Sequence, residues 1–149
     1  MMIVEKIMKR WIGIALALML VPMLASAEGF KDLDAAMSAI SRGFSTGQSR
    51  PVVEGVLEGD KVWLHFAGLL DDEAYFGRDQ VALLLDKLFS RVESTGFRRV
   101  SERKDSAENL WNVRAKWTFK QGEKVEERDL YISLANRDNR WKIVSIESR

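Results

Sequence analysis

Apolar residues recur at helical spacing over residues 30–44. One falls at every third or fourth position, with polar residues between, as on the buried face of an amphipathic helix. These positions are Phe30, Leu33, Met37, Ile40 and Phe44. Glycine commonly ends a helix because it readily adopts the left-handed conformation. The pattern therefore predicts a first helix that ends at Gly43 or Gly47.

Two further helices are expected. Ser49 is suited to cap a short one, with Pro51 in its first turn. The strongest helical pattern comes later, between a start at Gly77 and an end at Gly96. Its apolar face consists of Val81, Leu84, Leu85, Leu88, Phe89 and Val92. This pattern predicts a long helix over 81–92 that buries one face.

Elsewhere the apolar positions alternate with polar ones, as in strands with one buried face. In the most regular stretch, Asn112, Arg114, Lys116 and Thr118 alternate with an apolar set. That set is Trp111, Val113, Ala115, Trp117 and Phe119. A strand is expected over 61–67 and a short one at 75–76. Four more are expected over 97–104, 110–120, 125–135 and 141–147, joined by tight turns.

Helices followed by a run of strands favour an α+β fold rather than alternating strands and helices. We expect one domain over residues 28–149. Its architecture would be a curved antiparallel sheet wrapped around the helix at 81–92, with the N-terminal helices beside it. A segment of this length can bury a core without disulfides or metal ions.

The first 27 residues have the pattern of a cleavable secretory signal. Lys6, Lys9 and Arg10 precede an uncharged apolar run over 11–24. The run leads into the small residues Ala25 and Ala27, which suit signal peptidase. A membrane anchor is the alternative, but a spanning helix needs about 20 apolar residues. The pattern therefore predicts an exported protein, either periplasmic or secreted, that is not membrane-bound after cleavage.

Composition narrows the possible partners and cofactors. The chain has 23 Lys and Arg against 22 Asp and Glu, and three of the basic residues precede the apolar run. Residues 28–149 are therefore nearly neutral, which gives no indication of a nucleic-acid surface. There is no cysteine, so disulfides, thiol chemistry and zinc–thiolate sites are excluded. With a single histidine as well, we expect no metal site and no cofactor.

Several features resemble the cone-shaped nuclear transport factor 2-like superfamily. They are the glycines at 43 and 47, the Val-x-Leu-x-Phe strand at 62–66, the Tyr-Phe-Gly lead at 75–77, the alternating strand at 111–119 and the closing Trp-Lys-Ile-Val at 141–144. More narrowly, the chain is similar to small exported bacterial domains of that superfamily without an assigned function. The resemblance implies a pocket between the helices and the concave sheet. Some members are enzymes with an Asp or His in that pocket, and many others only bind ligands or partners.

The aromatic positions suggest two sites under this resemblance. If the cone is not completely filled by its core, a set of inward-facing residues would line an apolar ligand pocket. This set is Phe89, Trp111, Val113, Trp117 and Phe119. Superfamily members often dimerise through the outer sheet face. There Trp63, His65 and Tyr131 are expected to form an interface.

Candidate catalytic groups are few. His65 is the only histidine and is the weak candidate for a general base. In its strand Val62, Leu64 and Phe66 make the better buried face, so His65 is expected to point away from the helices. The acidic run 71–73 could bind a hard cation, but it lacks the spacing of a calcium loop and is more typical of a solvated turn.

Two groups of charged residues have structural interpretations. For the first group the structural interpretation is the better account, and for the second it explains the charges as well as a ligand-orienting role at the cone mouth would. Arg98, Arg99, Arg103 and Lys104 are expected to divide between the two faces of an edge strand, which charge protects from pairing with other sheets. The acidic positions 127 and 129 are expected to pair with the basic positions 114 and 116 across the sheet. Neither group is assigned a catalytic role.

The favoured function is an exported, non-catalytic domain that binds a small apolar ligand or another protein. The first alternative is a small cofactor-free isomerase, dehydratase or hydrolase that uses the cone pocket. The second is a structural homodimer without a ligand. A buried, perturbed carboxylate or histidine in the cone would favour the enzyme, and a filled cone with a large outer interface would favour the homodimer.

Overall fold

The computed structural model describes residues 29–149. The predicted leader, with Ala25 and Ala27, lies outside the described residues. Helix α2 (Leu33–Thr46) is followed by a short helix α3 (Arg50–Val53) and by the strands β1 (Lys61–Phe66) and β2 (Ala74–Gly77). Helix α4 (Arg78–Arg91) then leads into the remaining strands. These are β3 (Glu93–Asp105), β4 (Leu110–Gln121), β5 (Lys124–Arg137) and β6 (Arg140–Ser148).

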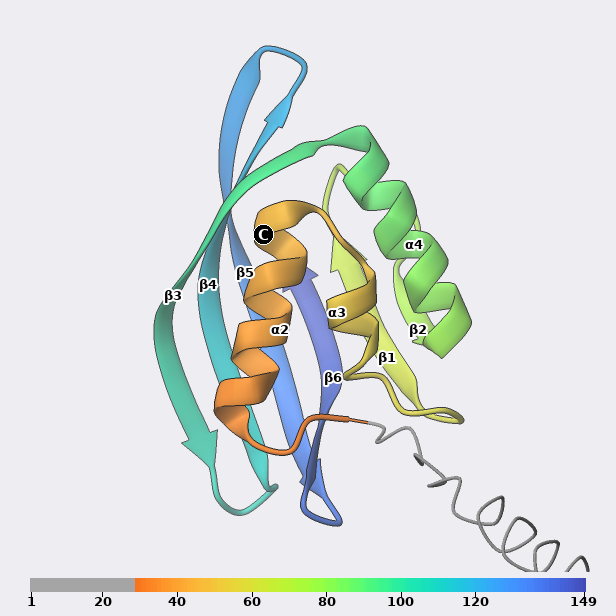
Figure 1. The fold of residues 1–149 in the computed structure, drawn as a ribbon, viewed down its shortest axis with the longest axis vertical. Helices are drawn as coiled ribbons and strands as arrows, with labels where there is room; N and C mark the ends of the chain where they lie inside the picture. Colours follow the sequence, from red (N-terminus) through yellow and green to blue (C-terminus); the bar gives the residue numbers. More distant parts are fainter. Residues whose placement is uncertain (1–28) are drawn as a thin grey trace, which may run out of the picture.

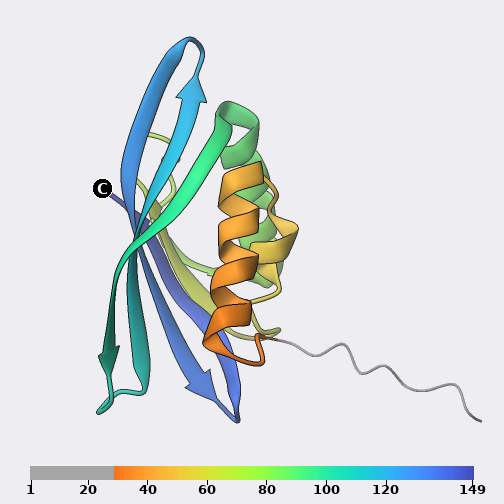
Figure 2. The ribbon, with the colours of Figure 1, turned by 60° about the vertical axis from the view of Figure 1, so that its left-hand side comes forward.

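The strands described here form one six-stranded sheet in the order β2-β1-β6-β5-β4-β3. Its curvature and the helices on one face are visible in Figure 1 and Figure 2. The α+β class and the curved sheet were predicted correctly. The sheet is mixed rather than wholly antiparallel, because β1 pairs in parallel with β6. These strands lie far apart in the chain, and hydrophobic alternation reports which face is buried but not the direction of pairing.

Two helices share the inner face of the sheet. Helix α2 packs against β3 and β4, whereas α4 packs against β1, β2 and β3. Figure 2 shows both helices on the same side of the sheet. The sheet was expected to wrap around the helix at 81–92, which corresponds to α4, but it packs against α2 as well.

Helix ends follow local chemistry. The Asp32 carboxylate accepts a hydrogen bond from the Ala35 N–H at 2.7 Å and so caps α2. The helix ends at Gly47, which is left-handed at φ 70°. Gly43 instead lies inside the helix, where a Cβ atom would come within 2.4 Å of Val52 Cγ2. The glycine at 43 is thus required by the close approach of α2 to α3.

Two predicted boundaries differ in detail. Ser49 stands before α3 as predicted, but its hydroxyl donates to the Asp86 carboxylate instead of capping the helix. The prediction that Gly96 ends the long helix was wrong. Helix α4 ends at Arg91, and β3 begins at Glu93 with almost no connection. Gly96 lies inside β3, beside a bulge in its pairing with β4.

The alternating pattern of β4 is reproduced in full. Trp111, Val113, Ala115, Trp117 and Phe119 are all buried on the inner face. Leu130, Ile132 and Leu134 of β5 are buried beside them. No helix within residues 29–149 is long and apolar enough to cross a membrane.

Candidate functional site

An aromatic cluster occupies the interior at the far end of β4. The Phe44 and Trp117 rings lie 5.5 Å apart and edge-on, and Trp117 and Phe119 lie 4.4 Å apart. Trp117 is completely buried, and its indole N–H donates to the Ser94 hydroxyl at 3.2 Å. The rings in contact are Phe44, Phe66, Phe89, Phe97, Trp117 and Phe119. Three residues predicted to line a pocket, at 89, 117 and 119, therefore pack together as core.

The other end of β4 carries a second pair of rings. Trp111 is only 3% exposed, and its ring centroid lies 6.5 Å from that of Trp141 at the start of β6. Trp141 is held by backbone hydrogen bonds of 2.8 Å in both directions with Phe30. Val113 is buried next along the strand. The predicted pocket residues are thus divided between two ends of the inner face.

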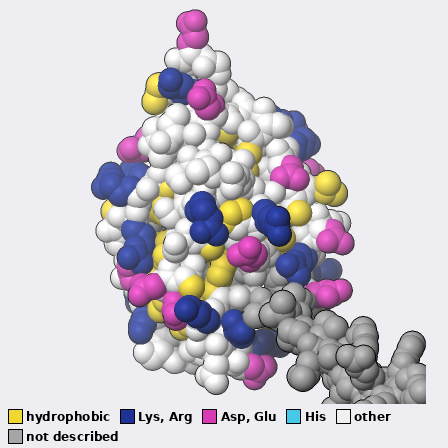
Figure 3. Space-filling view, viewed as in Figure 1, with side chains coloured by type: hydrophobic (Ala, Val, Ile, Leu, Met, Phe, Trp, Pro, Cys, Tyr) yellow, Lys and Arg dark blue, Asp and Glu magenta, His cyan; other side chains and the backbone are white. Residues whose placement is uncertain are grey.

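An open cleft lies at the tryptophan end, between the start of α2 and the sheet. We call it the α2–sheet cleft, and its volume is about 530 Å³. Its walls are Asp32, Leu33, Asp34, Arg99, Glu102, Lys104, Trp111 and Trp141. A smaller hollow of about 300 Å³ continues it along α2 and shares Asp34 and Arg99. Figure 3 shows apolar side chains exposed between α2 and β3, flanked by basic and acidic ones.

The charged groups at the cleft differ in how they are paired. Arg99 Nη1 lies 3.1 Å from Glu102 Oε1, and the Asp32 carboxylate is used in capping α2. Asp34 and Lys104 make no ion pair with any residue in 29–149. The cleft therefore presents one carboxylate and one ammonium group that are available to a ligand.

The outer face of the sheet, opposite the helices, carries the predicted interface residues. The Trp63 and Tyr75 rings lie 5.1 Å apart, and Tyr75 is 63% exposed. His65 of β1 and Tyr131 of β5 share this face, because each is paired in register with Glu147 of β6. His65 Nε2 is 3.8 Å from Glu73 Oε2, so the predicted acidic turn contributes one contact to it. The histidine thus lies on the face opposite the α2–sheet cleft.

The predicted cross-strand charge pairs also lie on the outer face. Asp129 accepts from Lys116 Nζ at 2.8 Å and from Arg114 Nη2 at 3.0 Å. These two hydrogen bonds, from Lys116 first, lower the pKa of the Asp129 carboxyl. Glu127 lies 3.9 Å from Lys116. The arrangement supports the structural interpretation of these charges.

Sequence reasoning did not assign Asp34, Met37 or Trp141 to a site. Trp141 entered only as part of the last strand and of the closing Trp-Lys-Ile-Val feature at 141–144. The isolated bridge between Phe30 and Trp141 brings the segment just before α2 and the last strand together at the cleft, and no local pattern indicates such a contact. Within residues 29–149, no three His, Cys, Asp or Glu side chains cluster so as to hold a metal ion.

Comparison with solved structures identifies the fold. A DUF4783 family protein from Bacteroides ovatus is similar with a TM-score of 0.61 and 18% identity, over 74% of this chain and 91% of that one. A designed nuclear transport factor 2-like protein with a long sheet has a TM-score of 0.60 and 12% identity, over 79% and 100% of the two chains.

A third similar structure has a ligand. It is a hypothetical protein from Catenulispora acidiphila with a ketosteroid isomerase-like fold, in complex with trimethylamine. Its TM-score is 0.58 at 9% identity, over 76% of this chain and 83% of that one. No protein-family model matches the sequence, and no curated protein matches it significantly. At these identities the comparisons establish a nuclear transport factor 2-like fold.

Proposed function

We propose that this nuclear transport factor 2-like domain is an exported, non-catalytic binding domain whose ligand occupies the α2–sheet cleft. The observation that carries the proposal is the division of the interior. An aromatic cluster fills one end, while a cleft of about 530 Å³ opens at the other. Ligand sites are typically concave, of roughly 300–1,000 Å³, with apolar walls and a few polar groups. The volume of the α2–sheet cleft lies in this range, and Leu33, Trp111 and Trp141 supply apolar wall among five charged residues.

The side chains of the cleft favour a ligand with a flat or extended apolar part and polar ends. Trp141 offers part of its ring surface, which suits apolar or cationic groups, while Trp111 is almost completely buried behind the wall. Asp34 and Lys104 offer one charge of each sign at the rim. The Catenulispora protein, whose fold is similar, is in complex with trimethylamine. That complex supports the idea that a domain of this fold can bind a small molecule.

Native mass spectrometry tests the proposal. Protein that begins at Glu28 would be purified from an exporting host. We expect an adduct that is lost on denaturation and that quenches tryptophan fluorescence when it is added back. In Asp34→Asn, loss of the free carboxylate should weaken rebinding by about tenfold, equivalent to about 1.4 kcal/mol.

Asp79→Asn is the matched control. Asp34 and Asp79 each lie in the first turn of a 14-residue helix, so both variants lose a similar interaction with the helix dipole. Only Asp34 lines the α2–sheet cleft. If both variants weaken rebinding of the adduct equally, or if neither weakens it, the ligand binds outside the α2–sheet cleft.

Export is the part of the proposal that rests on residues 1–27. The charged start, the short apolar run and the small residues at 25 and 27 support it. We expect the protein from an exporting host to begin at Glu28 in N-terminal sequencing. Ala27→Phe should block processing and leave the full-length chain. A mature protein that retains Met1 would contradict export by cleavage.

A second candidate function is a homodimer formed through the outer sheet face. The specific observation in its favour is the aromatic pair of half-buried Trp63 and exposed Tyr75, with Tyr131 on the same face. Exposed aromatic residues mark partner surfaces. Such a dimer leaves the α2–sheet cleft on the opposite face open, so the two functions are compatible.

A further inference from the structure

Strand β3 forms one margin of the sheet. It pairs with β4 along one side only, and no strand within residues 29–149 pairs with its other side. Figure 1 shows β3 as the last strand of the sheet, with no element beyond it. The strand has 13 residues, whereas β2 at the opposite margin has four. A long free edge offers a row of backbone donors and acceptors to another extended chain.

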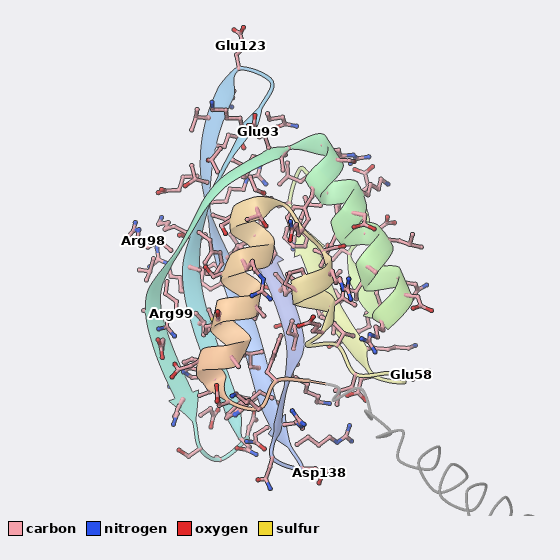
Figure 4. All side chains as sticks on the ribbon, viewed as in Figure 1. Glu58, Glu93, Arg98, Arg99, Glu123 and Asp138 are labelled. Atoms are coloured by element: carbon pink, nitrogen blue, oxygen red, sulfur yellow. The ribbon has the colours of Figure 1, made fainter. Side chains whose placement is uncertain are left out.

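Cationic side chains stand on both faces of this edge. Arg98 and Arg103 lie opposite Lys116 and Asn112 and so share the outer face. Arg99 and Lys104 lie opposite the buried residues of β4 and so share the inner face. Figure 4 shows Arg98 and Arg99 on β3 at the margin of the sheet.

Most of these cations are available to a partner. Arg98, Arg103 and Lys104 make no ion pair with residues 29–149, and only Arg99 is paired, with Glu102. The Asp105 carboxylate accepts from the Ala107 and Glu108 N–H groups in the next turn. The edge from 98 to 105 thus carries an excess of positive charge that no described acidic group balances.

Hollows flank the edge on both faces. On the inner face, Arg99, Glu102 and Lys104 form one wall of the α2–sheet cleft. On the outer face, Ser101 and Arg103 border a groove of about 300 Å³ that reaches across the sheet to Tyr131. Val100, the extra residue at the bulge between Arg99 and Ser101, is 41% exposed. Successive side chains of an added strand point to opposite faces, so they would alternate between these two hollows.

We propose that β3 accepts an extended acidic segment of a partner protein as an added strand. Backbone hydrogen bonds along the edge would supply affinity, and the two hollows would receive alternate side chains. The cations would select carboxylates, and they would repel a second copy of β3. The inner hollow is the α2–sheet cleft, so the added strand would place alternate side chains beside the site of the proposed function.

The test uses labelled peptides of about eight residues, the length of an ordinary strand. The probe alternates Glu and Val, and one comparison peptide replaces each Glu by Lys. A second comparison methylates the backbone nitrogen at every other residue of the Glu–Val peptide. At low salt, we expect fluorescence anisotropy to detect binding of the Glu–Val peptide but not of either comparison peptide. Hydrogen exchange should show new protection in β3.

The double variant Arg98→Glu, Arg103→Glu should weaken this binding by about a hundredfold, because two charges at the edge change sign from positive to negative. Arg50→Glu, Lys87→Glu makes the same net charge change on α3 and α4 and should bind within about twofold of the wild type. Thermal melts would confirm that both variants fold. Neither Arg98 nor Arg103 lines the α2–sheet cleft, so the small-molecule adduct should persist in both.

Three results would overturn the inference. They are no binding of the Glu–Val peptide, equal binding of its methylated form, and binding without protection of β3. If the peptide results fail in one of these ways but the small-molecule adduct still forms and still depends on Asp34, strand addition is wrong and the proposed function stands. If instead the peptide binds as expected but no adduct that depends on Asp34 is found, the proposed function is wrong.

Discussion

Single glycines show how closely the helices and the sheet approach each other. At Gly55, between α3 and β1, a Cβ atom would come within 2.3 Å of Phe30 Cε2 and 2.8 Å of Ile143 Cδ1. Both neighbours are buried core residues, so neither can move aside without disturbing others. The absence of a side chain at Gly55 lets the segment just before α2 approach the last strand near the α2–sheet cleft.

Gly55→Ala should therefore destabilise the domain by about 1–3 kcal/mol, as overpacked core positions do. The free energy of unfolding in urea measures the effect. Gly96→Ala is the control, because there a Cβ atom would meet Thr118 at an ordinary contact distance of 3.8 Å. Equal stability of the Gly55→Ala variant and the wild type would contradict the close packing described here.

At the scale of elements, charge pairs tie β4 to β5 on the outer face. Asp129 is hydrogen-bonded to Lys116 and Arg114, and these contacts lower the pKa of its carboxyl. The folded state therefore favours the ionised carboxylate more than the unfolded state does. Such a group stabilises the fold fully above its unfolded pKa, near 4, and loses that contribution as the pH falls through the lower folded pKa.

Asp129→Asn should be less stable than the wild type at pH 7, and the difference should shrink below about pH 4 as the wild-type carboxylate is protonated. Urea denaturation at a series of pH values measures this. Glu123→Gln, at the turn between β4 and β5, should show no such dependence, because Glu123 makes no described ion pair. A constant difference from pH 7 to pH 2 would show that the ion pairs contribute nothing.

Local pattern predicted most elements, and the reason differs from one to the next. Regular alternation identified β4 because one of its faces is buried along nearly its whole length. The turn between β5 and β6 follows from Asp138 and Asn139, which adopt positive φ values of 52° and 61°. At the end of α4 the pattern failed. Glycine 96 resembles a helix stop, but the chain enters β3 earlier because pairing with β4 begins at Glu93.

At the scale of the whole molecule, the two sheet faces have different roles. The inner face holds the core and the α2–sheet cleft, while the outer face carries ion pairs and exposed aromatic residues. If the outer face forms a homodimer, a charge placed there should separate the copies, because burying it without a partner is costly.

Trp63→Arg should therefore convert a dimer to a monomer in light scattering coupled to size-exclusion chromatography. Leu83→Arg is the control, because Leu83 is 69% exposed on α4, away from the outer sheet face. A wild-type protein that stays monomeric at high concentration would remove the homodimer from consideration.

The sequence by itself determined the buried face of each element and the α+β class, because hydrophobic periodicity is a local property of the chain. It also determined that Arg114, Lys116, Glu127 and Asp129 would share a face. Tertiary structure decided which aromatic residues fill the core and which border a cleft. Phe89 and Trp117 meet Phe44 of α2, and Phe119 packs against Trp117. Trp111 instead meets Trp141 beside Phe30. Those contacts join residues far apart in the chain, and no local spacing reports them.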